Sequence, residues 1–145
     1  MRTISLLMVL LAGAGLAFQA PINARLRDHA GSPLASALIS FATGTIVLAA
    51  LLLGTSSPLS VDRLRTGPWW IFIGGSLGVL YVFSAIIAVP RIGAAMLLVA
   101  AVAGQLVGAM GIDHFGWFGI EPSPFNAKRA AGAVLLAAAL WCLRK

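Results

Sequence analysis

The ionisable side chains that could carry catalysis are few, and all of them fall in loops or at the ends of apolar runs. The acids are Asp28, Asp62, Asp113 and Glu121, and the histidines are His29 and His114. They form no carboxylate pair, no metal-ligand spacing and no glycine-rich phosphate loop after a strand. The single cysteine, Cys142, excludes an internal disulfide. We therefore expect neither an enzyme nor a metal or cofactor site.

The apolar runs themselves contain no acidic side chain. A proton-coupled cation exchanger needs a carboxylate inside the membrane, where it can hold either the cation or protons. Because the midspan positions are neutral, this mechanism is disfavoured, and a neutral, zwitterionic or anionic substrate is favoured.

Uncharged polar side chains are the remaining candidates for a site. Gly15, Gln19, Asn23 and Arg27 recur every four residues, which places them on one helix face. Pro21 removes a backbone hydrogen bond there, so a kink would free a carbonyl group beside this stripe. The stripe is typical of a polar substrate path and equally of hydrogen-bonded contacts between helices. The candidates for the path are Gln19, Asn23, Ser40, Tyr81, Ser84 and Gln105.

Two further groups of residues are candidates for contacts rather than for the path. Asp113 and His114 close an apolar run, where they could form a surface pair, a helix cap or a gate. Gly104 and Gly108 form a G-x-x-x-G pair with Gly111 three residues on, which allows two helix backbones to approach closely. We expect these glycines to pack helices or a dimer.

These side chains must be positioned by membrane helices, because the composition leaves no alternative. Of 145 residues, 60% are hydrophobic and 10% charged, and the mean hydropathy is +0.99. A soluble domain is about half apolar and a quarter charged. The ten Lys and Arg residues are scattered between apolar runs, which is typical of helix ends at lipid headgroups and not of a nucleic-acid-binding patch.

The predicted fold is an all-α integral membrane protein with a single transmembrane domain over residues 1–145. A spanning helix needs about 20 apolar residues. Five helices are predicted, at residues 3–26, 33–53, 68–89, 92–112 and 125–143, with Ser32-Pro33 typical of a helix start. The fifth crosses only if it begins near Phe125 and the side chains of Lys128 and Arg129 extend toward water. Gly54–Gly67, containing Ser56-Ser57-Pro58, is predicted to be a polar loop. The first run lacks a cleavage site of small residues, so we expect it to be retained.

Positive charges in short loops set the orientation of a membrane protein. With five spans, one face receives Arg2, Arg63, Arg65, Lys128 and Arg129, and the other receives Arg25, Arg27, Arg91, Arg144 and Lys145. The balance predicts insertion in both orientations, and two opposite copies can form an antiparallel dimer with the inverted symmetry of many transporters. If the fifth helix does not cross, Arg144 and Lys145 change face, and the count becomes seven against three. A single orientation would then be expected.

Several segments together resemble the YdcZ-like proteins of the drug/metabolite transporter superfamily. They are Gln19-Ala20-Pro21-Ile22-Asn23-Ala24-Arg25-Leu26, Ser40-Phe41-Ala42-Thr43-Gly44-Thr45, Pro90-Arg91-Ile92-Gly93, Gly104-Gln105-Leu106-Val107 and Ile112-Asp113-His114-Phe115-Gly116-Trp117-Phe118-Gly119. The resemblance covers nearly the whole chain and implies a five-helix transporter unit that pairs with itself or with a homologous subunit. It also implies a distant relation to the small multidrug resistance exporters, which are antiparallel dimers with an essential Glu in the first helix. Gln19 is the polar midspan residue here, so their cation chemistry does not transfer.

The resulting expectation is a multi-pass protein of the bacterial inner membrane that moves a small solute by alternating access. The partners expected are a second copy, oppositely oriented, and the lipid bilayer. The alternatives are one half of a heterodimeric transporter and a structural or regulatory membrane protein that transports nothing.

Overall fold

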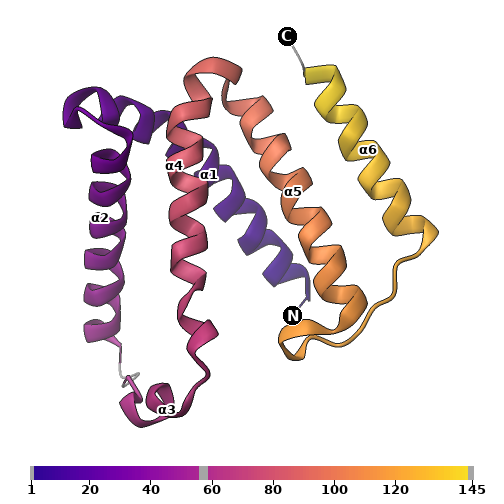
Figure 1. Ribbon diagram of the computed structural model, residues 1–145, viewed down its shortest axis with the longest axis horizontal. Helices are drawn as coiled ribbons and strands as arrows, with labels where there is room; N and C mark the ends of the chain where they lie inside the picture. The colour runs from indigo at the N-terminus through magenta and orange to yellow at the C-terminus, as the bar shows by residue number, and fades with distance from the viewer. Residues whose placement is uncertain (1, 56–58, 144–145) are drawn as a thin grey trace. The chain divides into compact units, whose positions relative to one another are not determined.

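The computed structural model describes residues 2–55 and 59–143, and every regular element within them is helical. In chain order they are α1 (Arg2–Ala30), α2 (Pro33–Gly54), α3 (Val61–Thr66), a 3-10 helix (Trp69–Phe72), α4 (Gly74–Ile92), α5 (Ala94–Phe115), a second 3-10 helix (Trp117–Gly119) and α6 (Ala127–Leu143) (Figure 1). The all-α prediction is confirmed. The helices form two compact units, Met1–Pro90 and Arg91–Lys145, which we call unit 1 and unit 2.

Among the described residues, four helical segments are long and apolar enough to cross a membrane. They are Thr3–Ala30, Pro33–Gly54, Trp69–Ile92 and Ala94–Phe115. The 17 residues of α6 reach about 26 Å at 1.5 Å per residue, which is less than the hydrocarbon thickness of about 30 Å. The structure thus supports four spans, and the fifth crossing stays a prediction.

The connection between α1 and α2 explains why α1 extends beyond its predicted end at residue 26. The helix continues to Ala30 and ends at Gly31, whose φ of 81° favours glycine and whose N–H donates to the Arg27 carbonyl at 2.9 Å. Ser32 Oγ then accepts from the Ala35 N–H at 3.0 Å. The predicted helix start at Ser32-Pro33 is confirmed.

Other element ends differ from the predicted ones for local reasons. The loop predicted at Gly54–Gly67 contains α3, with Asp62 in its first turn and two arginines in its last, the charge order that a helix dipole favours. Ser56, Ser57 and Pro58 lie outside the described residues. The third predicted helix begins as a 3-10 turn at Trp69–Phe72 before α4 continues to Ile92. The helix α5 ends later than predicted, before Gly116, which has a φ of 67°.

In unit 1, the buried core lies where α1, α2 and α4 meet. Small side chains from α1 and α2 allow close approach, and the α4 face supplies larger ones; the buried apolar residues are Ala20, Ala24, Ala37, Val82, Ala85, Ile86 and Val89. Phe41 and Tyr81 pack against Ala37, Val82 and Ile86. Most other apolar side chains on these helices are exposed, which suits helices surrounded by lipid tails.

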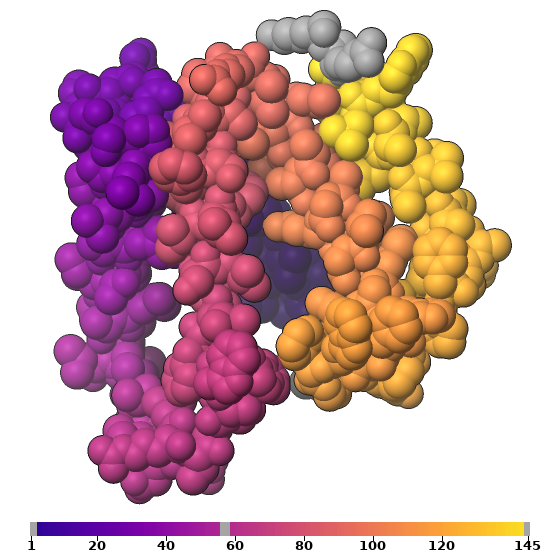
Figure 2. Space-filling view, in the orientation of Figure 1, coloured from indigo at the N-terminus to yellow at the C-terminus, as the bar shows by residue number. Residues whose placement is uncertain are grey.

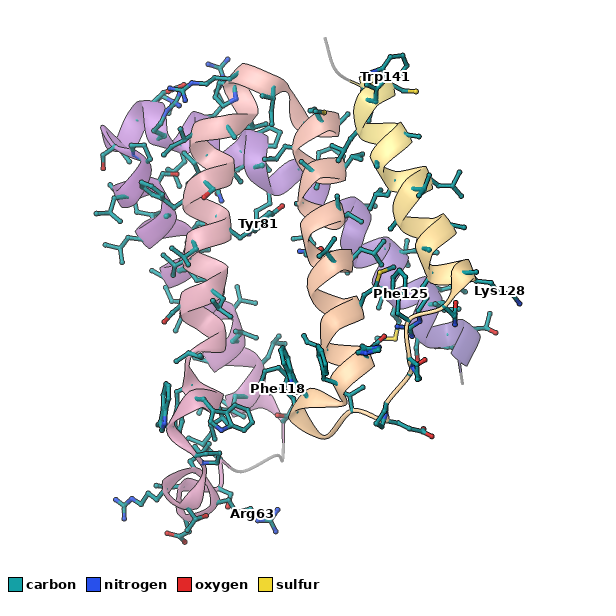
Figure 3. The ribbon with its side chains drawn as sticks, turned by 45° about the vertical axis from the view of Figure 1, so that its right-hand side comes forward. Arg63, Tyr81, Phe118, Phe125, Lys128 and Trp141 are labelled. Atoms are coloured by element: carbon teal, nitrogen blue, oxygen red, sulfur yellow. The ribbon has the colours of Figure 1, made fainter. Side chains whose placement is uncertain are left out.

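In unit 2, α6 folds back beside α5, so that the two form a hairpin (Figure 1). Lys128 and Trp141 lie at opposite ends of α6 (Figure 3). Bulky side chains gather at the end of unit 2 where α5 leads into the loop (Figure 2). Phe115 and Trp117 stack there with ring centroids 5.3 Å apart. Aromatic side chains at a helix end are typical of the headgroup region of a membrane.

Candidate functional site

Asn23 is the most buried of the predicted path residues, with only 4% of its surface exposed. Its backbone carbonyl accepts a hydrogen bond of 2.7 Å from Ser36 Oγ, which joins α1 to α2. Its carboxamide offers two donors and an acceptor and makes no hydrogen bond within the described part of the chain. Because no buried side-chain nitrogen or oxygen there lacks a partner, the carboxamide atoms keep some exposure. The backbone of Asn23 is therefore part of a helix contact, and its side chain remains available to a solute or a water molecule.

Three other candidates lie partly buried on the helices that surround Asn23. Gln19 is one turn before it on α1, and Ser40 is one turn after Ser36 on α2. Tyr81 lies about midway along α4 (Figure 3) and packs against the cluster of Ala37, Val82 and Ile86. Unit 1 thus carries these four of the six path candidates on α1, α2 and α4, and the core cluster that Tyr81 packs against joins α2 to α4.

The remaining two path candidates are placed differently. Ser84 is on α4 but exposed, next to the buried residue Ala85. Gln105 is exposed on α5 in unit 2. Neither has a hydrogen-bond partner for its side chain within residues 2–55 and 59–143. Their role in a path stays a prediction.

Pro21 lies inside α1, which continues through it as a single helix. The kink considered from the sequence does not interrupt the helix at this point. The carbonyl that accepts a bond from another helix is that of Asn23, because Ser36 faces it. Ser36 is fully buried, and its four-residue spacing with Ser40 was the only sequence signal for this contact.

A surface cleft of about 340 Å³ lies beside the C-terminal half of α1. Its lining residues are Pro21, Ala24, Arg25, Arg27, Asp28, Val89 and Pro90, all from unit 1. Arg27 donates twice to Asp28 Oδ1, from Nε at 3.2 Å and from Nη2 at 2.8 Å. Sequence analysis placed Arg27 on the polar stripe of α1 but did not predict this cleft, since the α4 residues that complete it, Val89 and Pro90, are 61 to 69 positions from the α1 residues.

In unit 2, Asp113 pairs with Arg129 and not with its neighbour His114. Arg129 Nη1 lies 2.9 Å from Asp113 Oδ2, and both side chains are one quarter to one third exposed. Arg129 also donates to Ser123 Oγ at 3.0 Å, and the Ser123 N–H donates to the Asp113 carbonyl at 2.7 Å. This network ties the end of α5 to the loop and to the start of α6.

His114 has a separate role in the same loop. Its Nδ1 accepts from the Phe125 N–H at 3.2 Å, so the neutral ring carries its proton on Nε2. Its ring also meets Phe115 edge to face, with centroids 4.8 Å apart. The two members of the predicted pair thus both hold the α5–α6 loop, and Arg129 and Ser123 are the partners that sequence analysis did not identify.

The glycines of α5 are open on the surface of unit 2. A Cβ atom added at Gly104, Gly108 or Gly111 would meet nothing within 4 Å. Gly104 and Asp113 are nine residues apart, which at about 100° per residue is half a turn beyond two full turns. Gly104 and Gly108 therefore lie on the side of α5 away from the ion pair with α6, whereas Gly111 lines a surface pocket together with Phe125 and Ala133.

The fold and these polar groups define a multi-pass helical membrane protein with uncharged hydrogen-bonding groups in a buried helix junction. Over residues 4–142 the sequence matches the family described as "Putative inner membrane exporter, YdcZ", and the chain belongs to this family. Inner membrane protein YdcZ of Escherichia coli (strain K12) is 26% identical over 147 residues, covering 99% of this chain and 97% of that protein. No solved structure matches the chain.

Membership of this family confirms the resemblance found in the sequence. Together with the four candidate spans, it makes the chain a multi-pass protein of the bacterial inner membrane. The description of the family names an exporter, which is a transport protein.

Proposed function

We propose that the protein carries a small solute across the inner membrane by alternating access, as an antiparallel homodimer whose subunits insert in both orientations. The observation that carries this proposal is Asn23, an almost fully buried polar residue whose carboxamide makes no hydrogen bond to the described part of the chain. No buried side-chain nitrogen or oxygen among the described residues lacks a partner, so the carboxamide atoms keep some exposure at the edge of the helix junction. Their two donors and one acceptor can bind a solute there by hydrogen bonds.

The polar groups near Asn23 also limit the kind of solute. The side chains of Gln19, Ser40 and Tyr81 are amide and hydroxyl groups, and no carboxylate is among the buried residues of α1, α2 and α4. Amide and hydroxyl groups bind by hydrogen bonds and do not exchange a proton for a cation. The proposed carrier is therefore not a carboxylate-dependent proton/cation antiporter.

The hairpin of unit 2 supports a fifth crossing by α6. An unpaired Arg129 at the start of this short helix would resist placement near the hydrocarbon, whereas pairing with Asp113 lowers that cost. Lys128, one residue earlier, can extend toward the headgroups. With the crossing, the positive charges remain evenly divided between the two faces. The pair Arg27–Asp28 then engages an arginine on one face, and the pair Arg129–Asp113 engages an arginine on the other. Arg144 and Lys145, which complete the count, lie outside the described residues.

The open glycine ridge supports a dimer contact. Gly104 and Gly108 occupy one side of α5 and meet no other group of unit 2. Membrane helices associate through such ridges because the backbones can approach closely without an entropic cost for side chains. A second copy in the opposite orientation would cover this ridge in the proposed assembly.

Transport is tested with purified protein in liposomes and a panel of labelled neutral, zwitterionic and anionic metabolites. Asn23→Leu removes the carboxamide at similar volume and should abolish flux while the dimer persists. Thr43→Val makes a comparable polar-to-apolar change at an exposed α2 position and should retain flux. Equal flux for wild type and Asn23→Leu, or no flux above empty liposomes for any solute, would contradict the proposal. Loss of the dimer in Asn23→Leu would favour a packing role instead.

Orientation is tested with the native thiol of Cys142, which is exposed near the end of α6. A membrane-impermeant maleimide added outside spheroplasts should label about half of the molecules if insertion is balanced. Glu121→Cys adds a second thiol in the α5–α6 loop. If α6 crosses, no molecule takes up two labels from one side. Uniform labelling or uniform protection of Cys142 would exclude the dual-topology homodimer, and doubly labelled molecules would exclude the fifth crossing.

A further inference from the structure

The cleft beside α1 combines a cationic edge with apolar walls. Pro21 and Ala24 form the α1 wall, and Val89 and Pro90 form the α4 wall. The polar groups are Arg25, Arg27 and Asp28, that is, two guanidinium groups and one carboxylate. The cleft therefore carries one positive charge more than it can pair internally.

The excess charge resides on Arg25. Asp28 Oδ1 is engaged twice by Arg27, at 2.8 and 3.2 Å, which fixes that guanidinium against the carboxylate. Arg25 Nη1 is 3.9 Å from Asp28 Oδ2, beyond hydrogen-bonding distance, and its side chain is 87% exposed. Arg25 thus keeps its donors available to an anion at the edge of the cleft.

The position of the cleft along α1 sets the depth of such an anion. The apolar segment Thr3–Ala30 ends within two residues of Asp28, so the guanidinium groups lie at the headgroup end of the span, with the proline and alanine walls on the hydrocarbon side. Basic pockets between membrane helices are suited to phosphate headgroups, and guanidinium binds phosphate through two parallel hydrogen bonds. A volume of about 340 Å³ accommodates a headgroup-sized ligand.

We infer that this cleft binds a phosphate ester, with Arg25 as the main phosphate ligand, while Arg27 is engaged by Asp28. The ligand is either the headgroup of an anionic phospholipid or a soluble phosphate ester of the same chemistry. This site is separate from the path around Asn23, and it would bind phosphate whether or not the protein transports a solute.

The test measures binding to the purified full-length protein by native mass spectrometry and thermal shift. The probes are phosphatidylglycerol, soluble glycerol 3-phosphate and phosphatidylcholine as the uncharged lipid control. Arg25→Gln should weaken binding of the preferred phosphate probe about tenfold, because it removes a charge-assisted pair of hydrogen bonds. Arg63→Gln, which removes one positive charge from α3, is the matched control and should leave binding unchanged.

A third variant predicts an effect of the opposite sign. Asp28→Asn removes the competing carboxylate and leaves both guanidinium groups for phosphate, so binding should tighten severalfold. Preference for phosphatidylglycerol would identify the ligand as lipid, and equal binding of glycerol 3-phosphate would identify it as a soluble ester. If neither phosphate probe binds better than phosphatidylcholine, or if Arg63→Gln weakens binding as much as Arg25→Gln, the inference is overturned.

Discussion

The ion pair between Asp113 and Arg129 should be the main polar tie between α5 and α6. The perturbation is a double-mutant cycle of Asp113→Ala, Arg129→Ala and the double variant. Each single variant leaves one charge without its partner at the loop end of the hairpin, and Arg129→Ala also removes the bond to Ser123 Oγ. The loss of stability in the double variant should therefore be smaller than the sum of the losses in the two single variants.

The size of this coupling follows from the geometry. Two unit charges about 4 Å apart attract by about 4 kcal/mol at an effective dielectric constant of about 20. Fully exposed pairs retain only about 0–1 kcal/mol of this attraction. With side chains of Arg129 and Asp113 that are 26% and 33% exposed, the pair lies between the surface and the interior. We expect a coupling energy of about 1–2 kcal/mol, which overlaps the lower end of the range of about 1.5–3 kcal/mol for hydrogen bonds to charged groups.

The assay is unfolding in mixed micelles by titration with sodium dodecyl sulfate, followed by circular dichroism. The charge-swapped variant, Asp113→Arg with Arg129→Asp, is the control and should recover most of the lost stability if attraction between the two side chains is responsible. A coupling energy indistinguishable from zero, or a swapped variant no better than the single ones, would refute the reasoning. The hairpin would then be held by apolar contacts alone.

Three further outcomes follow from the packing and the backbone. Gly108→Ile should shift the protein from dimer to monomer in crosslinking and light scattering, while Ala138→Ile, at an exposed site on α6, should not. Ser36→Ala should lower the free energy of unfolding by about 1 kcal/mol, since it removes the α2–α1 hydrogen bond. Gly116→Ala should lower the free energy of unfolding by about 2 kcal/mol, because its φ of 67° is unfavourable for alanine and the new Cβ would lie 2.8 Å from Pro122 Cγ. Gly119→Ala, with the same strain but open space around the new Cβ, should lower it by only about 1 kcal/mol. All three are checked by the same detergent unfolding or by oligomer measurements.

The helices could be predicted from the sequence because the bilayer demands long apolar segments and the chain provides little else. The start of α2 at Ser32-Pro33 was predictable from a capping side chain and a proline, and the structure has both. The end of α1 was predicted at residue 26, before the charged residues Arg27 and Asp28, whereas the helix continues to Ala30. These two residues continue the helix because they neutralise each other, and Gly31 is the first residue to break it.

The candidate site was only partly predictable, for a different reason. A four-residue spacing places Gln19, Asn23 and Arg27 on one face, but it does not say which helix covers that face. The Ser36 hydroxyl, the Arg129 guanidinium and the α4 wall of the cleft are all contributed by distant parts of the chain. Such contacts depend on how helices pack, which spacing within one helix does not determine.

The two ion pairs bear on how one chain could insert both ways. Arg27–Asp28 belongs to the end of α1, and Arg129–Asp113 belongs to the loop between α5 and α6. Because α2, α4 and α5 lie between these two places, the crossing of these three helices puts them on opposite membrane faces whether or not α6 crosses. With five crossings, each face has one arginine held by an aspartate and four other positive side chains. Changing Asp28 and Asp113 separately to Asn should therefore alter the arginine environment of opposite faces. If acids reduce the orienting effect of a paired arginine, the two variants should shift Cys142 labelling in opposite directions. Shifts in the same direction would place both pairs on one face and contradict the crossing of α2, α4 and α5.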